Sequence, residues 1–137
     1  MRILVDTNVL LDVLGRRPPN WPQASRVWTL AETGSIQAYI SAISYNNTYY
    51  IVRRWGGRKR AESSLRLLRD VFETVDLTQK ILIQAMDSEL SDFEDSIQYF
   101  SAIHTNASFI ITRNTEDFPK VGPIVMSPGE WLATLSE

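Results

Sequence analysis

The sequence contains no cysteine and a single histidine, His104. The absence of cysteine excludes disulfide bonds, thiolate metal sites and cysteine nucleophiles, and one histidine cannot supply a zinc site that needs several imidazoles. Long apolar runs are also missing: the first, at residues 3–5, is too short for a secretion signal, and no stretch approaches the roughly 18–20 apolar residues of a membrane span. We therefore expect a soluble cytoplasmic protein with no membrane contact.

The size and composition are those of one globular domain. The chain has 137 residues and a mass of 15.7 kDa, with 44% hydrophobic and 22% charged residues. A chain of this length buries roughly two-thirds of the surface that its unfolded form exposes, which is enough for a real core. We therefore expect a single domain over residues 1–137 and no general disorder.

The net charge of −2 is uninformative, but the charges are unevenly distributed. Residues 53–69 carry seven basic side chains and one acid, Glu62, whereas residues 70–95 carry eight acids and one base, Lys80. A basic block can hold a polyanion, and clustered carboxylates can hold a hard cation. Two solvated helix faces would explain the same pattern, so neither block alone assigns a function.

Short apolar runs alternate with segments of helical periodicity along the chain. The runs predict buried strands at residues 2–5, 36–40, 74–77, 109–112 and 124–126. Helices are predicted at residues 7–14, 22–32, 44–54, 59–72, 78–88, 91–105 and 128–135, with residues 55–57 breaking the third from the fourth. This alternation indicates an α/β fold with a parallel sheet and helices on both faces.

The polar residues that follow the strands are the first candidates for a site, because ligands of open α/β sheets bind beyond the carboxyl ends of the strands. Asp6 directly follows the first strand, and Asn114 and Asp117 follow the strand at residues 109–112. Each also has an ordinary structural explanation, since aspartate is a good helix N-cap and Asn and Asp favour turns. Their position alone therefore leaves both interpretations open.

The helix predicted at residues 91–105 opens with a run of acids. Ser91 and Glu94 fit a capping box, which explains Glu94 without a functional role. Asp95 fits a first-turn acid favoured by the helix dipole, and it shares a helix face with Asp92 and Tyr99. On the adjoining side of the helix we expect an apolar stripe of Phe93, Ile97 and Phe100. His104 lies on the same side, so we expect it to be a partly buried structural residue.

The predicted arrangement of strands and helices brings Asp6, Asp95 and Asp117 toward one edge of the sheet. Three converging carboxylates repel one another unless a divalent cation lies between them. Ligation by oxygen alone suits Mg²⁺ or Mn²⁺, and such an ion can lower the pKa of a bound water and stabilise charge on a phosphate. We therefore expect these acids to converge within metal-bridging distance.

Three segments together resemble the PIN domain: residues 6–12 (Asp-Thr-Asn-Val-Leu-Leu-Asp), 92–95 (Asp-Phe-Glu-Asp) and 112–118 (Thr-Arg-Asn-Thr-Glu-Asp-Phe). The chain is similar to the small stand-alone PIN proteins, which include the VapC-type toxins of toxin–antitoxin pairs. The resemblance implies a three-layer, Rossmann-like α/β/α sandwich and an endoribonuclease that depends on Mg²⁺ or Mn²⁺. It also implies RNA as the substrate, an antitoxin as a protein partner and a homodimer.

The resemblance assigns roles residue by residue. The catalytic and metal-binding acids of the family match Asp6, Asp95 and Asp117, with Asp92 as a further ligand. Positions that orient the site match Asn8, Thr112 and Asn114.

One position departs from the family pattern. PIN domains usually carry a glutamate on the helix after the second strand, and the match places Asn47 there. Its carbonyl can accept a hydrogen bond and help to orient the site, but it carries no charge, and no acid lies between Thr33 and Gly57 to replace the glutamate. The alternative function is a catalytically weak PIN-like domain that binds RNA or a protein partner.

A group of basic residues is a candidate for contact with RNA phosphates: Arg53, Arg54, Arg58, Lys59 and Arg60. Neighbouring aromatic rings suit stacking on bases, and they suit a core or a dimer contact equally well: Tyr45, Tyr49 and Tyr50.

A receiver-type signalling domain is a third alternative, since it is also an α/β fold with an acidic Mg²⁺ pocket. It requires paired acids after the first strand and a lysine near the last strand. Asp6 is unpaired and Lys120 is poorly placed, so this alternative ranks below the other two.

Overall fold

The centre of the molecule is a parallel sheet. The structure, a computed structural model, describes residues 1–135. The strands are β1 (Arg2–Val5), β2 (Gln37–Ser41), β3 (Glu73–Val75), β4 (Phe109–Ile111) and β5 (Ile124–Met126). They form one five-stranded sheet in the order β3-β2-β1-β4-β5, and every neighbouring pair is parallel. The central strand β1 is apolar on both faces because helices cover both, so Ile3, Leu4 and Val5 are buried.

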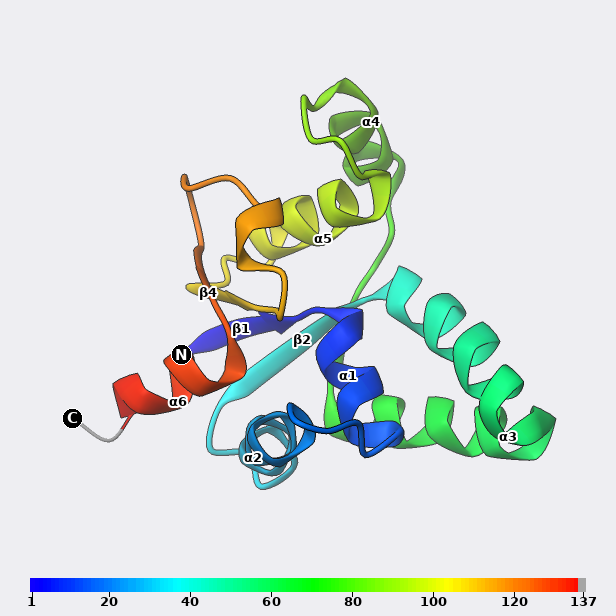
Figure 1. Cartoon of the computed structure of the whole chain (residues 1–137). Helices are drawn as coiled ribbons and strands as arrows, with labels where there is room; N and C mark the ends of the chain where they lie inside the picture. Colours follow the sequence, from blue (N-terminus) through cyan, green and yellow to red (C-terminus); the bar gives the residue numbers. More distant parts are fainter. Residues whose placement is uncertain (136–137) are drawn as a thin grey trace.

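Helices form the two outer layers of a three-layer α/β/α sandwich (Figure 1). One face is covered by α1 (Thr7–Leu14), α2 (Trp21–Glu32) and α6 (Pro128–Leu135), and its core includes Leu10 and Trp131. The other face carries α5 (Phe93–His104), and α4 (Gln79–Asp87) packs against α5 through Ile81 and Ile97. The predicted fold class is confirmed.

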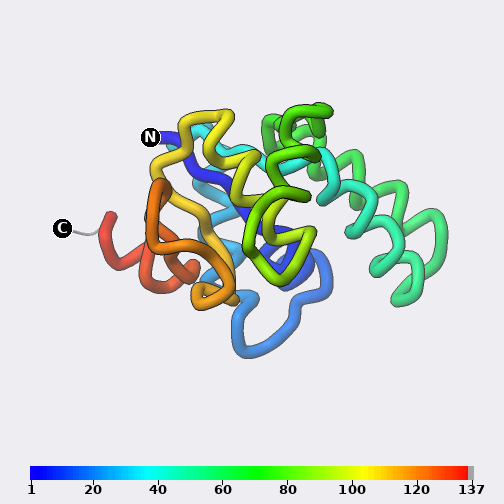
Figure 2. The backbone as a smooth tube through the Cα atoms, turned by 90° about the horizontal axis from the view of Figure 1, so that it is seen from above, coloured from blue at the N-terminus to red at the C-terminus, as the bar shows by residue number. Residues whose placement is uncertain are grey.

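The helix α3 (Ala42–Val71) bends at Gly57. Gly57 adopts φ 88° and ψ 179°, a backbone conformation that is essentially restricted to glycine. The bend lies at the edge of the molecule opposite the N-terminus (Figures 1 and 2), and the second half of α3 returns so that Leu68 and Phe72 join the core. The predicted helix break at residues 55–57 is thus confirmed.

The strand order sets the position of the candidate site. The connections of the chain switch from one side of the sheet to the other between β1 and β4, and such a switch point is where open α/β sheets bind ligands. Val5 of β1 lies opposite Ile111 of β4, so Asp6 and Thr112 follow at the same edge. The N–H of Asp6 donates to the carbonyl of Ile111 (2.9 Å) and extends the strand pairing to the start of the site.

The predicted elements are all present in residues 1–135, with shifted ends. The second strand runs from Gln37 to Ser41 instead of ending at Ile40, and the third ends at Val75 instead of Leu77. Pairing with neighbouring strands decides these ends, and local sequence does not show that pairing. Within the same residues, no helix is both long and apolar enough to cross a membrane.

Three details predicted for the helix at residues 91–105 are wrong. Asp92 is the N-cap of α5, and its side chain accepts from the N–H of Asp95 (2.9 Å), so Glu94 is not part of a capping box with Ser91. Phe93 is the first residue of α5 and is 48% exposed, rather than part of a buried stripe.

The third error concerns the histidine, which is exposed and not partly buried. His104 is the last residue of α5, and its Nε2 lies 2.7 Å from Oε1 of Gln84 in α4. The helix ends there and leaves the ring at the surface, away from the carboxyl edge of the sheet.

Candidate active site

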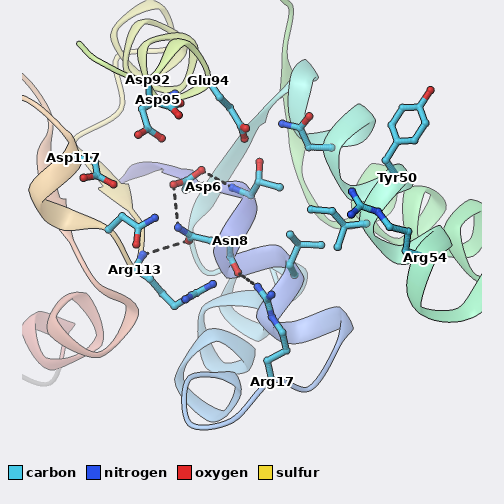
Figure 3. Close-up of a pocket in the computed structure, with 15 residues that line it drawn as sticks. Asp6, Asn8, Arg17, Tyr50, Arg54, Asp92, Glu94, Asp95, Arg113 and Asp117 are labelled. Carbon is cyan, nitrogen blue, oxygen red and sulfur yellow. Dashed lines mark hydrogen bonds between the residues drawn. The ribbon is translucent and has the colours of Figure 1, made fainter.

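A pocket of about 500 Å³ lies at the carboxyl ends of β1 and β4 (Figure 3). We call it the acidic pocket, because α5, β1 and the segment after β4 each contribute carboxylates to it. Its acidic, amide, basic and other lining residues are Asp6, Thr7, Asn8, Leu11, Arg17, Asn47, Tyr50, Ile51, Arg54, Asp92, Glu94, Asp95, Arg113, Asn114 and Asp117.

Asp6 is the most rigidly held of these acids. It caps α1 by accepting the N–H of Thr7 (2.7 Å), and it also accepts the hydroxyl of Thr112 (2.8 Å) and the amide of Asn8 (3.3 Å). Burial raises the pKa of Asp6 to about 6, although the hydrogen bonds from Thr112 and Thr7 oppose the shift. The side chain is therefore an N-cap and a member of the pocket at once.

Thr112, Asn8 and Asn114, the residues expected to orient the site, are linked to Asp6 by hydrogen bonds. Thr112 is fully buried beneath the pocket, and its hydroxyl accepts from the side chain of Asn8 (3.2 Å) and the N–H of Asn114 (3.1 Å). Asn8 in turn accepts the N–H of Arg113 (3.3 Å). The three residues link the end of β4 to the start of α1 and fix the Asp6 carboxylate.

Asp95 lies in the first turn of α5, facing Asp6 and Asp117 across the pocket (Figure 3). Partial burial raises the pKa of Asp95 to about 7, with further increases from the negative charges of Asp6, Asp92, Asp117 and Glu94. The four neighbours act on one carboxyl, so the acids share one electrostatic site although they come from three parts of the chain.

Asn47 of α3, the residue expected at the family's glutamate position, lines the same pocket. Its side-chain Nδ2 is buried and has no hydrogen-bond partner among residues 1–135. The α3 side of the pocket thus contributes a neutral amide with an unsatisfied donor.

The acids share the pocket without forming a ready-made metal cage. No group of three Asp, Glu or His side chains within residues 1–135 is arranged to hold a metal ion, so the expected convergence of Asp6, Asp95 and Asp117 within metal-bridging distance is not met. The hydrogen bonds of Asp6 hold its carboxylate at the start of α1. The donor set is nevertheless all oxygen, which fits Mg²⁺ or Mn²⁺.

Sequence reasoning missed three charged residues of the pocket. Glu94 was attributed to helix capping, and Arg17 and Arg113 were not singled out, although Arg113 lies within the segment 112–118. Arg17 could not be predicted from local sequence, because it reaches the pocket only through the turn that follows α1.

The predicted basic group divides in the structure. Arg54 lines the acidic pocket, whereas the other four residues lie outside it near the bend of α3. Arg58 pairs with Glu62 (2.8 Å) at the surface, and Arg60 donates to the carbonyl of Leu14 (3.2 Å). Arg53 and Lys59 are exposed.

A buried polar network lies behind the pocket and joins the helices that line it. The amide of Gln98 in α5 donates to the hydroxyls of Thr7 in α1 (3.3 Å) and Ser44 in α3 (3.1 Å), which are themselves 2.8 Å apart. All three side chains are buried. Thr7 neighbours Asp6, and Gln98 and Ser44 lie one helical turn from Asp95 and Asn47, so this network sets the spacing of the site.

The fold is shared with several solved proteins. Similar solved structures include VapBC2 from Rickettsia felis bound to a DNA fragment from its promoter (18% identity, TM-score 0.70, covering 93% of this chain and 98% of the other). Another is a toxin–antitoxin complex from Klebsiella pneumoniae (24% identity, TM-score 0.68, covering 92% of this chain and 97% of the other). A third is the sarcin–ricin loop cleaving toxin VapC20 from Mycobacterium tuberculosis (16% identity, TM-score 0.64, covering 79% of this chain and 86% of the other). These likenesses show a shared fold.

Among curated proteins, the search found no match. The family model of the PIN domain, in contrast, matches residues 2–116, which include β1, β4 and every acid of the pocket except Asp117. Since this match covers most of the sequence, the chain belongs to the PIN domain family.

Proposed function

We propose that this protein is a metal-dependent endoribonuclease of PIN type. The observation that carries the proposal is the crowding of carboxylates around Asp95 in the acidic pocket, where burial first and then these negative charges raise the pKa of Asp95 to about 7. Oxygen donors concentrated at the carboxyl edge of a parallel sheet suit a hard divalent cation. An open pocket beside such a cation suits hydrolysis of a phosphodiester.

The ligands in this proposal are acids of the pocket. When bound, the Mg²⁺ or Mn²⁺ ion supplies positive charge for the phosphate and lowers the pKa of a water molecule. The side chains that would hold it are Asp6, Asp95 and Asp117, with Asp92 beside them.

The remaining polar residues position these acids. Thr112 and Asn8 fix the carboxylate of Asp6 by hydrogen bonds, and Asn114 is fixed in turn through its N–H to Thr112. Asn47 presents an amide to the pocket, where it orients the site without adding charge. The register of β1 and β4, with Val5 opposite Ile111, supports these roles, since Asp6 and Thr112 follow the paired residues.

We also propose that the protein is the toxin of a toxin–antitoxin pair in the cytoplasm. Support comes from the shared fold with proteins solved as toxin–antitoxin complexes. A neighbouring open reading frame whose product co-purifies with this chain would support an antitoxin partner. A chain that purifies alone when both genes are expressed together would count against one.

The function is tested by incubating the purified protein with total RNA in Mn²⁺, in Mg²⁺ and in excess chelator. Cleavage in Mn²⁺ or Mg²⁺, its loss in chelator, and its loss in Asp6→Asn are the expected results. Asp87→Asn is the matched control, because Asp87 is an exposed acid of α4 outside the pocket. Cleavage that survives in chelator or in Asp6→Asn would contradict the proposal.

The neutral side chain at position 47 favours a second candidate function. A pocket that lacks one acid of the family can bind a cation weakly, and such a protein would bind RNA or a partner without cutting RNA. RNA binding without cleavage at saturating Mn²⁺ would support this candidate over the first.

A further inference from the structure

Asp12 is a buried acid that the proposed reaction does not use. It lies in α1 with only 1% of its side chain exposed, and two arginines meet it: Nε of Arg17 is 3.0 Å from Oδ1, and Nε of Arg113 is 2.7 Å from Oδ2. A buried carboxylate requires a charged partner, but one arginine suffices for that. The second arginine leaves the trio with a net positive charge.

The two arginines reach this acid from distant parts of the chain. Arg17 follows α1 and Arg113 follows β4, and each is about one-third exposed at the rim of the acidic pocket. Figure 3 shows both guanidinium groups on the side of Asn8 opposite the carboxylates of Asp6, Asp95 and Asp117. The pocket thus has an acidic side and a cationic side.

Each guanidinium keeps hydrogen-bond donors for a ligand. Asp12 engages the Nε of both arginines, and Arg17 Nη2 makes a long contact with the carbonyl of Asn8 (3.4 Å). Within residues 1–135, the terminal nitrogens of Arg113 have no hydrogen-bond partner. Guanidinium groups fixed at Nε with free terminal N–H groups match the oxygens of a phosphate.

An aromatic ring continues the cationic side of the pocket. The Arg17 guanidinium lies 5.5 Å from the ring centre of Trp55, which is 39% exposed. Arg17, Trp55 and Arg60 line a second cavity of about 350 Å³, so Arg17 belongs to both cavities. An exposed indole beside fixed positive charges is a platform on which an unpaired base stacks.

We propose that Arg17 and Arg113, positioned by Asp12, bind a backbone phosphate of single-stranded RNA next to the acidic pocket, with a neighbouring base on Trp55. This inference rests on the proposed function and names the part of the site that holds the substrate. The acids face the phosphate to be cut, and the arginine pair holds an adjacent one. Asp12 is a positioning residue, since the arginines shield it from the ligand.

The test measures binding of a short fluorescein-labelled single-stranded RNA by anisotropy in excess chelator, so that no cleavage occurs. Arg17→Gln and Arg113→Gln should each weaken binding roughly fivefold to tenfold and reduce the slope of log affinity against log salt by about 0.7. Arg26→Gln removes the same charge from an exposed position of α2, outside the acidic pocket and the basic block at residues 53–69, and should change binding less than about twofold.

Asp12→Asn tests the positioning role. It makes the chain more positive, so simple charge attraction would strengthen RNA binding, whereas loss of positioning should weaken it roughly threefold or more. Thermal melting checks that this variant folds. Arg17→Lys and Arg113→Lys keep the positive charge but lose the planar set of guanidinium N–H donors. Compared with the glutamine variants, they should restore the salt slope but only part of the affinity.

The outcomes separate this inference from the proposed function. If both glutamine variants bind RNA as Arg26→Gln does, the arginine pair is no phosphate site, and Mn²⁺-dependent cleavage by the wild type would still stand. Tighter binding by a folded Asp12→Asn would overturn the positioning role. If the arginine variants lose binding while the wild type never cleaves RNA, the phosphate site holds and the nuclease proposal fails.

Discussion

Asp95 is the side chain whose ionisation depends most on the rest of the pocket. Its pKa rises from an ordinary 3.8 to about 7, and that of Asp6 rises to about 6. A carboxyl whose pKa is higher in the folded state favours folding at low pH. The contribution of these two groups to the free energy of unfolding is therefore complete below about pH 4. It is lost as the pH rises through about 6 for Asp6 and then about 7 for Asp95.

We predict that the melting temperature of the metal-free protein falls between pH 5 and pH 8 because of these groups. Asp95→Asn removes a carboxylate that is repelled by its neighbours, so it should flatten this fall and stabilise the metal-free protein at pH 8. The gain should be only about 1–2 kcal/mol, because water screens part of the repulsion at this partly exposed site. Calorimetric melts across this pH range provide the measurement. Asp87→Asn is the control, and an Asp95→Asn profile parallel to it would contradict the prediction.

Asn47→Glu should place one more carboxylate in the pocket from α3. The added charge is expected to tighten Mn²⁺ binding, because the affinity of hard-cation sites follows the number of charged ligands, and to lower stability without metal by repelling Asp95. Asn46→Glu, at the exposed neighbouring position, is the matched control. Equal Mn²⁺ affinity in both variants, measured by calorimetry, would show that position 47 does not act on the cation site.

Some residues of the site were predictable, and others were not, for physical reasons. Asp6 follows β1 directly and Asn114 lies three residues after β4, so the position of the sheet edge brings both into the pocket. Glu94 was missed because Ser91 and Asp92 are both good N-caps and local sequence does not choose between them. Asp12 and Arg113 are 101 residues apart in the sequence and meet only in the folded chain, so their ion pair cannot be predicted from sequence spacing.

At the scale of elements, Gln98 couples the helices that carry the site. Gln98→Leu removes its hydrogen bonds to Thr7 and Ser44 while keeping a similar volume. We predict a loss of about 1–3 kcal/mol in the free energy of unfolding, because two buried hydroxyls lose a donor, together with slower RNA cleavage. Denaturant unfolding and cleavage rates measure both.

Gln84→Leu is the control for that substitution, since Gln84 makes a surface hydrogen bond with His104. A folded Gln98→Leu that cleaves RNA as fast as Gln84→Leu would show that the network stabilises the fold without positioning the site.

The elements themselves followed from the sequence because their signals are local. Periodicity marked the helices, and two adjacent glycines marked the bend of α3, which needs a conformation that glycine supplies at Gly57. Exposure of particular helix residues was less predictable. Phe93 and His104 are the first and last residues of α5, and both are exposed. Helical periodicity predicts which face of a helix is buried, but it does not show how far along the helix that burial extends.

At the scale of the whole molecule, the parallel sheet and its helical layers followed from the alternation of strands and helices. The oligomeric state stays a prediction. Of the three tyrosines near the start of α3, Tyr45 bonds Thr74 (2.9 Å) and Tyr49 is partly buried, which leaves Tyr50 exposed. In the second half of α3, Leu67 is a further exposed apolar side chain (48%), and Arg66 and Arg69 lie beside it in the sequence.

We predict a homodimer, in which two basic stretches would lengthen the cationic track for RNA. Sedimentation equilibrium should report twice the chain mass at high protein concentration. Leu67→Asp should shift the equilibrium toward the monomer if the second half of α3 is the interface. A 15.7 kDa species at every concentration would dispose of the dimer.

The central claim, that the acids of the pocket form one cation site, is tested most directly by calorimetric titration of Mn²⁺ into the metal-free protein near neutral pH. The account predicts saturable binding that releases protons, because the Asp95 carboxyl is partly protonated there. It predicts weaker binding and less proton release in Asp95→Asn, and no change in Asp87→Asn. Absence of saturable binding, or equal binding by the wild type and Asp95→Asn, would contradict the claim.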